Sequence, residues 1–298
     1  MNEQRSFIRD NDQQEGALYL VPTPIGNLQD MTFRAVDILK QAHIIAAEDT
    51  RHSKKLCHKF EIDTPLLSYH EHNKREREDE LVRRVKGGEM VALVSDAGMP
   101  AISDPGADLV HRFKQEQLRV IALPGANAAV TALVTSGLPT DNFTFIGFLD
   151  RHKKQRKVQL EKWVTTPSTL IFYEAPHRLK DMMSAVYEVM GNRRVVLCRE
   201  LTKQYETIIN GTMEQVRHHL DNTEIKGECV IVIEGASEEE RAMAVEAPWW
   251  ENMTLISHVE AYIEKDGDNS KEAIKKVAKD RQISKREVYQ AYHVEEKD

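Results

Sequence analysis

Several glycine- and proline-rich loops of the sequence suit the binding of a flat, polar small molecule. Residues 95–106 read SDAGMPAISDPG, and residues 22–28 (PTPIGNL) and 123–129 (LPGANAA) have a similar composition. Glycine lets the backbone approach a ligand closely, and Asp96 and Asp104 supply acceptors for hydroxyl or amino groups. A stiff connection into a helix explains residues 22–28 equally well, and close structural packing of a small-residue helix explains residues 123–129 equally well. Capped turns are the alternative for residues 95–106, although loops of that length are more often functional.

Charged side chains gather at two other places. Glu174, His177 and Arg178 follow directly after an apolar run, where an acid and an imidazole are candidates for proton transfer. Capping of a helix by Glu174 and solvation of Arg178 would explain the same residues. Residues 151–157 (RHKKQRK) are the densest basic run, which favours either phosphate contact or a solvated helix face.

Motifs that are missing exclude several classes of enzyme. The sequence has no G-x-x-x-x-G-K-[ST], G-x-G-x-x-G, H-E-x-x-H or G-x-S-x-G. These absences argue against P-loop nucleotide hydrolases, nicotinamide dehydrogenases, zinc proteases and serine hydrolases. The three cysteines are far apart, so we expect no disulfide scaffold, no metal and a reducing, cytoplasmic location. A polar start and the lack of a long apolar run argue against secretion and membrane insertion.

The elements that would position these loops alternate between strands and helices. Apolar β-rich runs predict strands at 17–21, 44–47, 66–68, 90–94, 119–122, 143–147, 169–172, 195–199, 206–210 and 228–233. Helical spacing is found at 32–40, with Asp30 or Thr32 as N-cap, and at 76–86, 107–115, 126–134, 154–164, 178–190, 213–220, 252–264, 271–279 and 285–292. This alternation predicts an α/β fold with mainly parallel or mixed sheets.

The length of 298 residues suggests two domains. We expect a flexible N-terminal arm (1–15), two α/β domains (16–137 and 138–236), a linker (237–248) and a small helical tail (249–298). The candidate loops follow strands, and ligands of α/β sheets lie outside the carboxyl ends of strands.

The net charge of -7 argues against coating of nucleic acid by overall charge, but basic residues also cluster locally. The tail alone holds a group of them that suits contact with RNA, namely Lys271, Lys275, Lys276, Lys279, Arg281, Lys285 and Arg286.

Taken together, the motifs resemble the bacterial 16S ribosomal RNA 2′-O-ribose methyltransferase I family. This family is a branch of the tetrapyrrole methylases, the class III S-adenosylmethionine-dependent methyltransferases. The resemblance is carried, in family order from about residue 17 to 235, by residues 20–28, 47–51, 94–98, 102–106, 123–126, 172–178, 199–203 and 226–228. The Pro22–Gly26 turn replaces the G-x-G-x-G-D turn of the porphyrin and corrin enzymes, which favours the ribosomal branch.

The resemblance implies a homodimer in which S-adenosylmethionine lies in a cleft between the two α/β domains. It implies cofactor contacts from Pro24, Asp96, Gly98, Ala101, Ile102, Ser103, Ala126, Tyr173, Glu174 and Ala175. The substrate would be the small ribosomal subunit, with a cytidine of the decoding centre as target and Glu174 or His177 as proton acceptor. Candidate RNA contacts are Arg51, Arg151, Lys153, Lys154, Arg156, Arg178, Arg199, Lys203, Lys275, Lys279, Lys285 and Arg286.

Two other functions remain open from the sequence. The chain could be a ribosome-assembly factor that binds RNA without turnover, although the intact loops at 96–98 and 103–106 argue against it. It could also be a C-methyltransferase of uroporphyrinogen or a precorrin, which would need an apolar cleft of macrocycle size.

Overall fold

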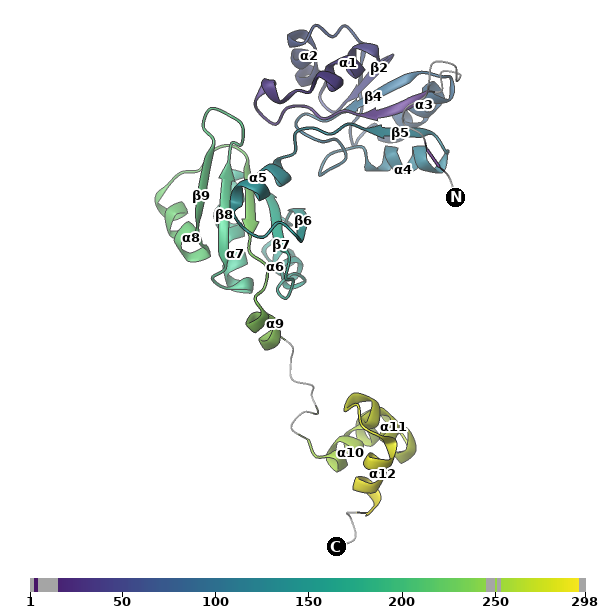
Figure 1. Ribbon diagram of the computed structural model, residues 1–298, viewed down its shortest axis with the longest axis vertical. Coiled ribbons are helices and arrows are strands. Elements are labelled where there is room, and N and C mark those ends of the chain that lie inside the picture. The colour runs from purple at the N-terminus through teal and green to yellow at the C-terminus, as the bar shows by residue number, and fades with distance from the viewer. Residues whose placement is uncertain (1–2, 5–15, 245–249, 251–252, 295–298) are drawn as a thin grey trace. The chain divides into compact units, whose positions relative to one another are not determined.

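A computed structural model describes residues 3–4, 16–244, 250 and 253–294 of the chain. The chain divides into two compact units, Met1–Ser237 and Glu238–Asp298. The first unit contains two five-stranded sheets and the second unit contains helices (Figure 1).

The first sheet is entirely parallel, as the alternation of strands and helices predicts. Its strands lie in the order β3-β2-β4-β1-β5. Their bounds are β1 (Ala17–Leu20), β2 (Ile44–Ala47), β3 (Leu66–Ser68), β4 (Met90–Val94) and β5 (Arg119–Ala122). They alternate with η1 (Leu28–Asp30), α1 (Phe33–Gln41), α2 (Thr50–Lys59), α3 (Lys74–Lys86) and α4 (Ala107–Gln115).

Apolar side chains on both faces of this sheet explain why helices cover both. Ala92 and Val94 of β4 pack with α1 and α2, whereas Val91 and Leu93 pack with α3 and α4. Successive residues of a strand point to opposite faces, so a run without polar residues must be buried on both sides. Thr32 caps α1 by accepting a hydrogen bond from the Ala35 backbone N–H, which confirms it as N-cap.

The second sheet has the order β6-β7-β10-β8-β9 and is mixed. Its strands are β6 (Phe143–Phe148), β7 (Thr169–Glu174), β8 (Arg194–Arg199), β9 (Thr207–Thr212) and β10 (Cys229–Ile233). Only β6 and β7 run parallel; the other three pairings are antiparallel. The helices of this part are α5 (Ala128–Ser136), η2 (Pro176–Arg178), α6 (Lys153–Glu161), α7 (Leu179–Met190) and α8 (Met213–Asn222).

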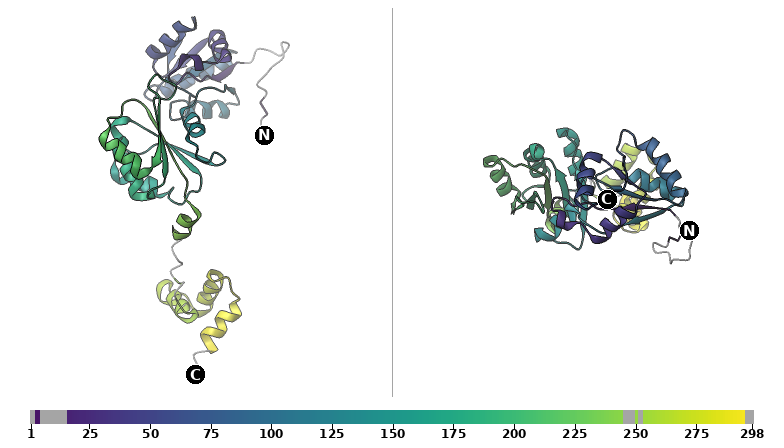
Figure 2. Two further views of the ribbon diagram at one scale, coloured as in Figure 1. Left: turned by 60° about the vertical axis from the view of Figure 1, so that its left-hand side comes forward. Right: turned by 90° about the horizontal axis from the view of Figure 1, so that it is seen from above.

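Helices again cover both faces of the second sheet (Figure 2). One face packs against α6, α7 and α8, whereas α5 lies on the other, with Ala132 and Leu133 against Val230 and Val232 of β10. The first α/β domain expected from the sequence (16–137) includes this helix. Its apolar small residues contact the second sheet instead.

The helical unit is built from α9 (Glu238–Ala244), α10 (Leu255–Asp266), α11 (Ser270–Asp280) and α12 (Lys285–Val294). Val259, Val277 and Val288 meet in the shared core of α10, α11 and α12. Thr254 and Asn269 cap α10 and α11, which fixes where these two helices begin.

Two further α-helices differ from the sequence-based expectation. Helix α2 was not predicted, and α9 lies inside the segment expected to be a linker, whose residues 245–248 lie outside the described residues. Of the expected N-terminal arm, only Glu3 and Gln4 are described, and the Gln4 amide hydrogen-bonds both backbone groups of Val120. In the part of the chain that the structure describes, no helix combines the length and the apolar composition that a membrane span requires.

Candidate functional site

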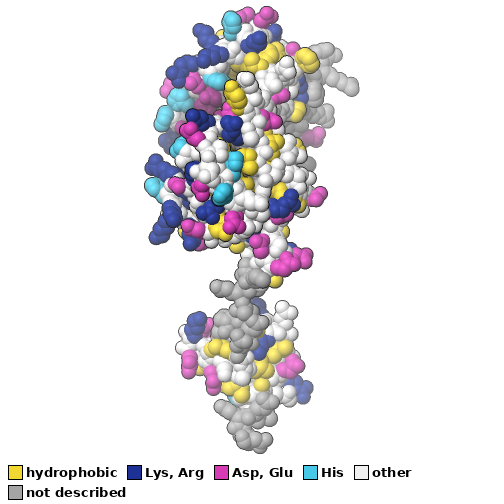
Figure 3. Space-filling model, turned by 90° about the vertical axis from the view of Figure 1, so that its left-hand side faces the viewer, with side chains coloured by type: hydrophobic (Ala, Val, Ile, Leu, Met, Phe, Trp, Pro, Cys, Tyr) yellow, Lys and Arg dark blue, Asp and Glu magenta, His cyan; other side chains and the backbone are white. Residues whose placement is uncertain are grey.

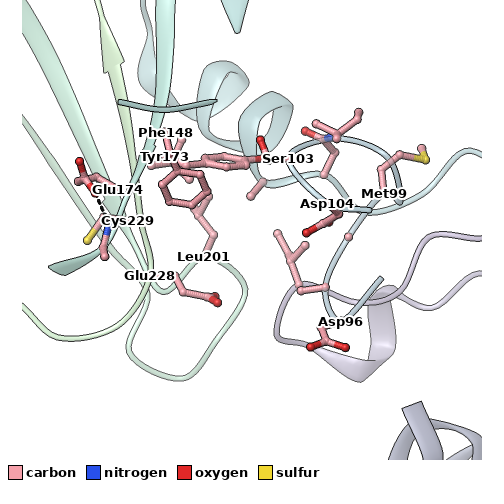
Figure 4. Close-up of a pocket in the computed structure, with 18 of the residues that line it drawn as sticks. Asp96, Met99, Ser103, Asp104, Phe148, Tyr173, Glu174, Leu201, Glu228 and Cys229 are labelled. Carbon is pink, nitrogen blue, oxygen red and sulfur yellow. Dashed lines mark hydrogen bonds between the residues drawn. The ribbon is translucent and has the colours of Figure 1, made fainter. Parts of the chain in front are cut away.

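The loops singled out in the sequence meet around one cavity of about 440 Å³ in the first unit (Figure 4). One wall comes from loops at the carboxyl ends of β1, β2 and β4, where parallel sheets place their ligands. The opposite wall comes from the second sheet and its loops, including Phe148, Tyr173, Leu201 and Glu228. The volume of the cavity falls within the range of small-molecule sites, roughly 300–1,000 Å³.

The loop after β4 is fixed in an unusual conformation. Gly98 and Thr23 exchange two backbone hydrogen bonds of 3.0 and 2.9 Å, which join the loops after β4 and β1. Ala101 and Ser103 adopt left-handed backbone angles, with φ of 68° and 59°. A residue other than glycine in this region costs about 1–3 kcal/mol, and such strain concentrates at functional sites. The loop is therefore held in a shape that its own residues do not prefer.

Acidic side chains gather at the first wall of the cavity. The Asp49 backbone N–H donates a 3.2 Å hydrogen bond to Asp96 Oδ1. Burial raises the pKa of Asp104 to about 6, a hydrogen bond with Ser95 opposes the rise, and the Asp96 charge adds to it. Burial and the charge of Asp104 also raise the pKa of Glu48. Carboxylates held this close favour a positively charged ligand, because such a ligand relieves their mutual repulsion.

The second sheet contributes an aromatic surface. The rings of Phe145 and Phe148 lie edge-on to Tyr173, with centroid distances of 4.9 and 5.7 Å. The Ala129 backbone N–H donates a 3.1 Å hydrogen bond to the Tyr173 hydroxyl, which fixes this ring. Phe148 remains 54% exposed, so an apolar face is available to a planar group.

Close contacts between the two walls define the width of the cavity. A Cβ on Gly147, whose φ is +75°, would lie 3.2 Å from Ser103 Oγ. The Asn27 backbone N–H donates a 3.1 Å hydrogen bond to Thr202 Oγ1 beside the cavity. Figure 4 shows the carboxylates of Asp104 and Glu228 extending into the cavity from opposite sides.

Glu174 and His177, the predicted proton acceptors, lie in different surroundings. The Glu174 side chain is fully enclosed: its Oε1 accepts a 2.9 Å hydrogen bond from the Ala175 backbone N–H and lies 3.2 Å from Arg178 Nε. Its Oε2 is buried and has no hydrogen-bond partner among the described residues. Arg178 also donates to the Leu149 carbonyl. His177 is exposed and is not among the described residues that line the cavity.

The cavity brings together most of the predicted cofactor residues, namely Asp96, Gly98, Ile102, Ser103, Tyr173, Glu174 and Ala175. Pro24, Ala101 and Ala126 do not line it, but each is followed in the chain by a residue that does. Sequence reasoning missed Glu48, Met99, Asn127, Phe148, Leu201, Glu228 and Cys229, among others. Several of them lie in or beside the motifs that carried the resemblance, and this position was the sequence signal that could have identified them.

Several predicted RNA contacts have internal partners instead. Arg156 is 4% exposed and donates a hydrogen bond to the Arg151 carbonyl, so it fixes the turn before α6. Arg199 donates to the carbonyls of Lys226 and Tyr205. Lys203 lies 2.9 Å from both Glu200 and Glu228, and the exposed Arg51 forms a 2.7 Å ion pair with Asp49. Apart from Arg178, the other predicted RNA contacts are exposed cations, namely Arg151, Lys153, Lys154, Lys275, Lys279, Lys285 and Arg286. On the face in Figure 3, basic and acidic side chains are interspersed.

Comparison with known proteins supports a methyltransferase. The family model of the tetrapyrrole (corrin/porphyrin) methylases matches residues 17–217. The chain is 53% identical to ribosomal RNA small subunit methyltransferase I of Bacillus subtilis (strain 168), over 99% of this chain and 100% of that protein. It is 41% identical to the protein of the same name from Synechocystis sp. (strain ATCC 27184 / PCC 6803 / Kazusa), over 92% and 96% of the two chains.

Solved structures share the fold at low identity. A cobalt precorrin-4 methyltransferase aligns with a TM-score of 0.56 and 17% identity, over 74% of this chain and 95% of its own. The uroporphyrin-III C-methyltransferase of Thermus thermophilus, complexed with S-adenosyl homocysteine, aligns with a TM-score of 0.52 and 18% identity, over 74% and 97%. These likenesses confirm the fold of two α/β sheets, each covered by helices.

Proposed function

Because the chain belongs to the ribosomal RNA small subunit methyltransferase I family, within the tetrapyrrole methylases, we propose that it methylates 16S rRNA. The donor is S-adenosylmethionine, and the acceptor is the ribose 2′-hydroxyl of a cytidine in the decoding centre of the small subunit. The observation that carries this proposal is the strained, acidic loop at 95–106 facing an aromatic wall across a cavity of cofactor size.

The residues of the cavity fit this donor. S-adenosylmethionine supplies a methyl group on a positively charged sulfur and also has a charged amino group. Asp96 and Asp104 supply negative potential for these cations, and the Phe148 and Tyr173 rings offer an apolar surface for a planar base. Glu174, whose buried Oε2 has no hydrogen-bond partner among the described residues, lies beside Tyr173 in the opposite wall. Holding the donor and the acceptor in the reactive orientation can lower the activation barrier by roughly 7–11 kcal/mol.

Asp104 is the proton acceptor that the geometry favours. Its carboxylate extends into the cavity, and its raised pKa of about 6 makes it more basic than an ordinary aspartate, yet mostly ionised at neutral pH. The Glu174 side chain is fully enclosed within the cavity wall, and His177 does not line the cavity, so the role of each as proton acceptor stays a prediction. General-base assistance would contribute about 10²–10⁴-fold to the rate.

The test is methyl transfer to small ribosomal subunits from a strain that lacks the protein. Purified protein with labelled S-adenosylmethionine should methylate one cytidine ribose, located by ribose-methylation mapping. Asp96→Asn should weaken donor binding in calorimetry, and Asp104→Asn should lower the single-turnover rate at saturating donor. Asp63→Asn, an exposed aspartate outside the cavity lining, is the matched control. Methylation of a base, or of a tetrapyrrole, by the wild-type protein would overturn the proposal.

We also propose that the active form is a homodimer in the cytoplasm. Val130 and Val134 of α5 are 47% and 65% exposed, and such apolar side chains would be covered by a second copy. The free thiols of Cys57, Cys198 and Cys229 fit a reducing compartment. Light scattering of the purified protein should give twice the chain mass, and a monomer that retains full activity would contradict the dimer.

A further inference from the structure

The helical unit contains a groove between α11 and α12 that the cofactor site does not use. It has a volume of about 500 Å³ and is lined by Ser270, Lys271, Ile274, Lys285, Arg286, Tyr289 and His293. Among the described residues, no acidic side chain lines this groove. The groove is therefore positive, although the protein as a whole has a net charge of -7.

The cations of the groove differ from a neighbouring lysine in what holds them. Lys276 of α11 lies 2.8 Å from Asp266 and 2.6 Å from Asp268, so its charge is neutralised within the fold. Lys271, Lys285 and Arg286 have no such carboxylate partner within residues 253–294. Unpaired, exposed cations retain their charge for an external anion.

An aromatic side chain lies beside these charges. Tyr289 is 55% exposed, and its ring centroid lies 4.5 Å from that of His293. Arg286, Tyr289 and His293 are spaced by three and four residues, so they share one face of α12. Val288 is fully buried in the helical core, which fixes this face outward. Burial in the fold does not explain an exposed tyrosine next to three cations that lack a carboxylate partner within residues 253–294.

We propose that this groove binds a single-stranded segment of the ribosomal RNA substrate, with a base stacked on Tyr289 and phosphates held by Lys271, Lys285 and Arg286. The inference rests on the proposed function and deepens it, because it names a second contact with the same substrate. An aromatic platform flanked by cations is the arrangement that binds single strands without sequence readout. An acidic protein partner would use the cations but would gain little from the stacking face.

The experiment uses the full-length protein and a fluorescein-labelled, single-stranded 12-nucleotide RNA of mixed sequence. Tyr289→Leu should weaken binding by about tenfold, because base stacking is lost while an apolar side chain remains. The double variant Lys285→Gln/Arg286→Gln should lower the slope of log affinity against log salt by about 1.4, or about 0.7 for each phosphate. Lys265→Gln is the control for the loss of one positive charge from the same unit, because this exposed lysine of α10 does not line the groove.

The outcomes separate this inference from the proposed function. If the wild type transfers methyl groups and all groove variants keep their RNA affinity, the proposed RNA site in the groove is refuted and the enzyme activity still stands. RNA affinity that depends on Tyr289, together with no methyl transfer, would support the groove as an RNA site and overturn the proposed methyltransferase activity. Competition by polyglutamate as strong as that by RNA, and insensitive to Tyr289→Leu, would identify an acidic protein as partner and refute the proposal. Circular dichroism of each variant shows whether α12 remains folded.

Discussion

Replacement of Asp104 by asparagine should stabilise the protein while it damages catalysis. Burial and the nearby Asp96 charge raise the pKa of Asp104 from 3.8 to about 6 in the folded chain. A difference of about 2 pKa units corresponds to about 3 kcal/mol. Because the side chain is only partly buried, we expect solvent to reduce this cost to about 1–2 kcal/mol. Asparagine has a similar shape and no charge, so the variant avoids this cost.

The direction of the pH dependence of folding stability follows from proton binding to Asp104. Between about pH 4 and pH 6 the folded state keeps the Asp104 proton that the unfolded chain has already lost, so folding stability falls as the pH rises. Asp104→Asn should therefore match the wild type at pH 4 and exceed it at pH 8. A gain of about 1–2 kcal/mol corresponds to a rise of roughly 2–8 °C in Tm for a unit of this size.

The assay is thermal unfolding of both proteins at pH 4, 6 and 8, with methyl transfer measured in parallel at pH 8. Asp63→Asn serves as control and should show no pH-dependent difference from the wild type. A variant that is less stable than the wild type at pH 8, or a gain that is the same at every pH, would refute the reasoning. Unchanged activity would separately remove Asp104 from the reaction.

Three further results are expected. Arg178→Ala should lower the unfolding free energy by about 3–5 kcal/mol in urea titrations, because it leaves the enclosed Glu174 carboxylate without its ion pair, and Arg178→Lys should restore part of this loss. Ser103→Gly should leave stability unchanged or raise it by up to about 1 kcal/mol, since glycine tolerates φ of 59°, while calorimetry should show weaker donor binding by the loosened loop. Burial raises the pKa of Cys198 to about 11 and of Cys229 to about 12. Iodoacetamide should therefore label neither thiol at pH 8 until the protein is unfolded. Rapid labelling of the native protein would contradict this expectation.

The order of elements followed from the sequence because hydrophobic period and turn residues agree locally. Val91–Val94 is an unbroken apolar run, and burial on both faces of a parallel sheet requires such a run. Helix α2 was missed because its apolar positions are few: Ser53 and Cys57 are its buried side chains, and the rest of the helix is largely charged or polar. Asp49, which accepts from the Arg51 backbone N–H, was the N-cap signal that pointed to it.

The direction of a strand and the partner of a helix depend on contacts distant in sequence. The unbroken apolar run of β10, which includes Val230 and Ile231, would be the same whether β10 pairs parallel or antiparallel with β7. The apolar surface of α5 likewise fits either sheet, and the fold places it on the second. Arg156 is a similar case: its burial depends on the Arg151 carbonyl that its guanidinium reaches, and a count of basic residues does not include that contact.

The site was predictable where glycine and proline mark a loop, and unpredictable where the fold brings like charges together. Glu48 and Asp104 come from different loops, yet burial and the Asp96 charge raise the pKa of both, and the Asp104 charge also raises that of Glu48. Ala101 and Ser103 are held at backbone angles that their residue types disfavour. Each of these features lowers folding stability, and local sequence preference predicts none of them. Their concentration around one cavity is best explained by selection for the ligand, because a fold optimised for stability alone would remove them with single substitutions such as Asp104→Asn and Ser103→Gly.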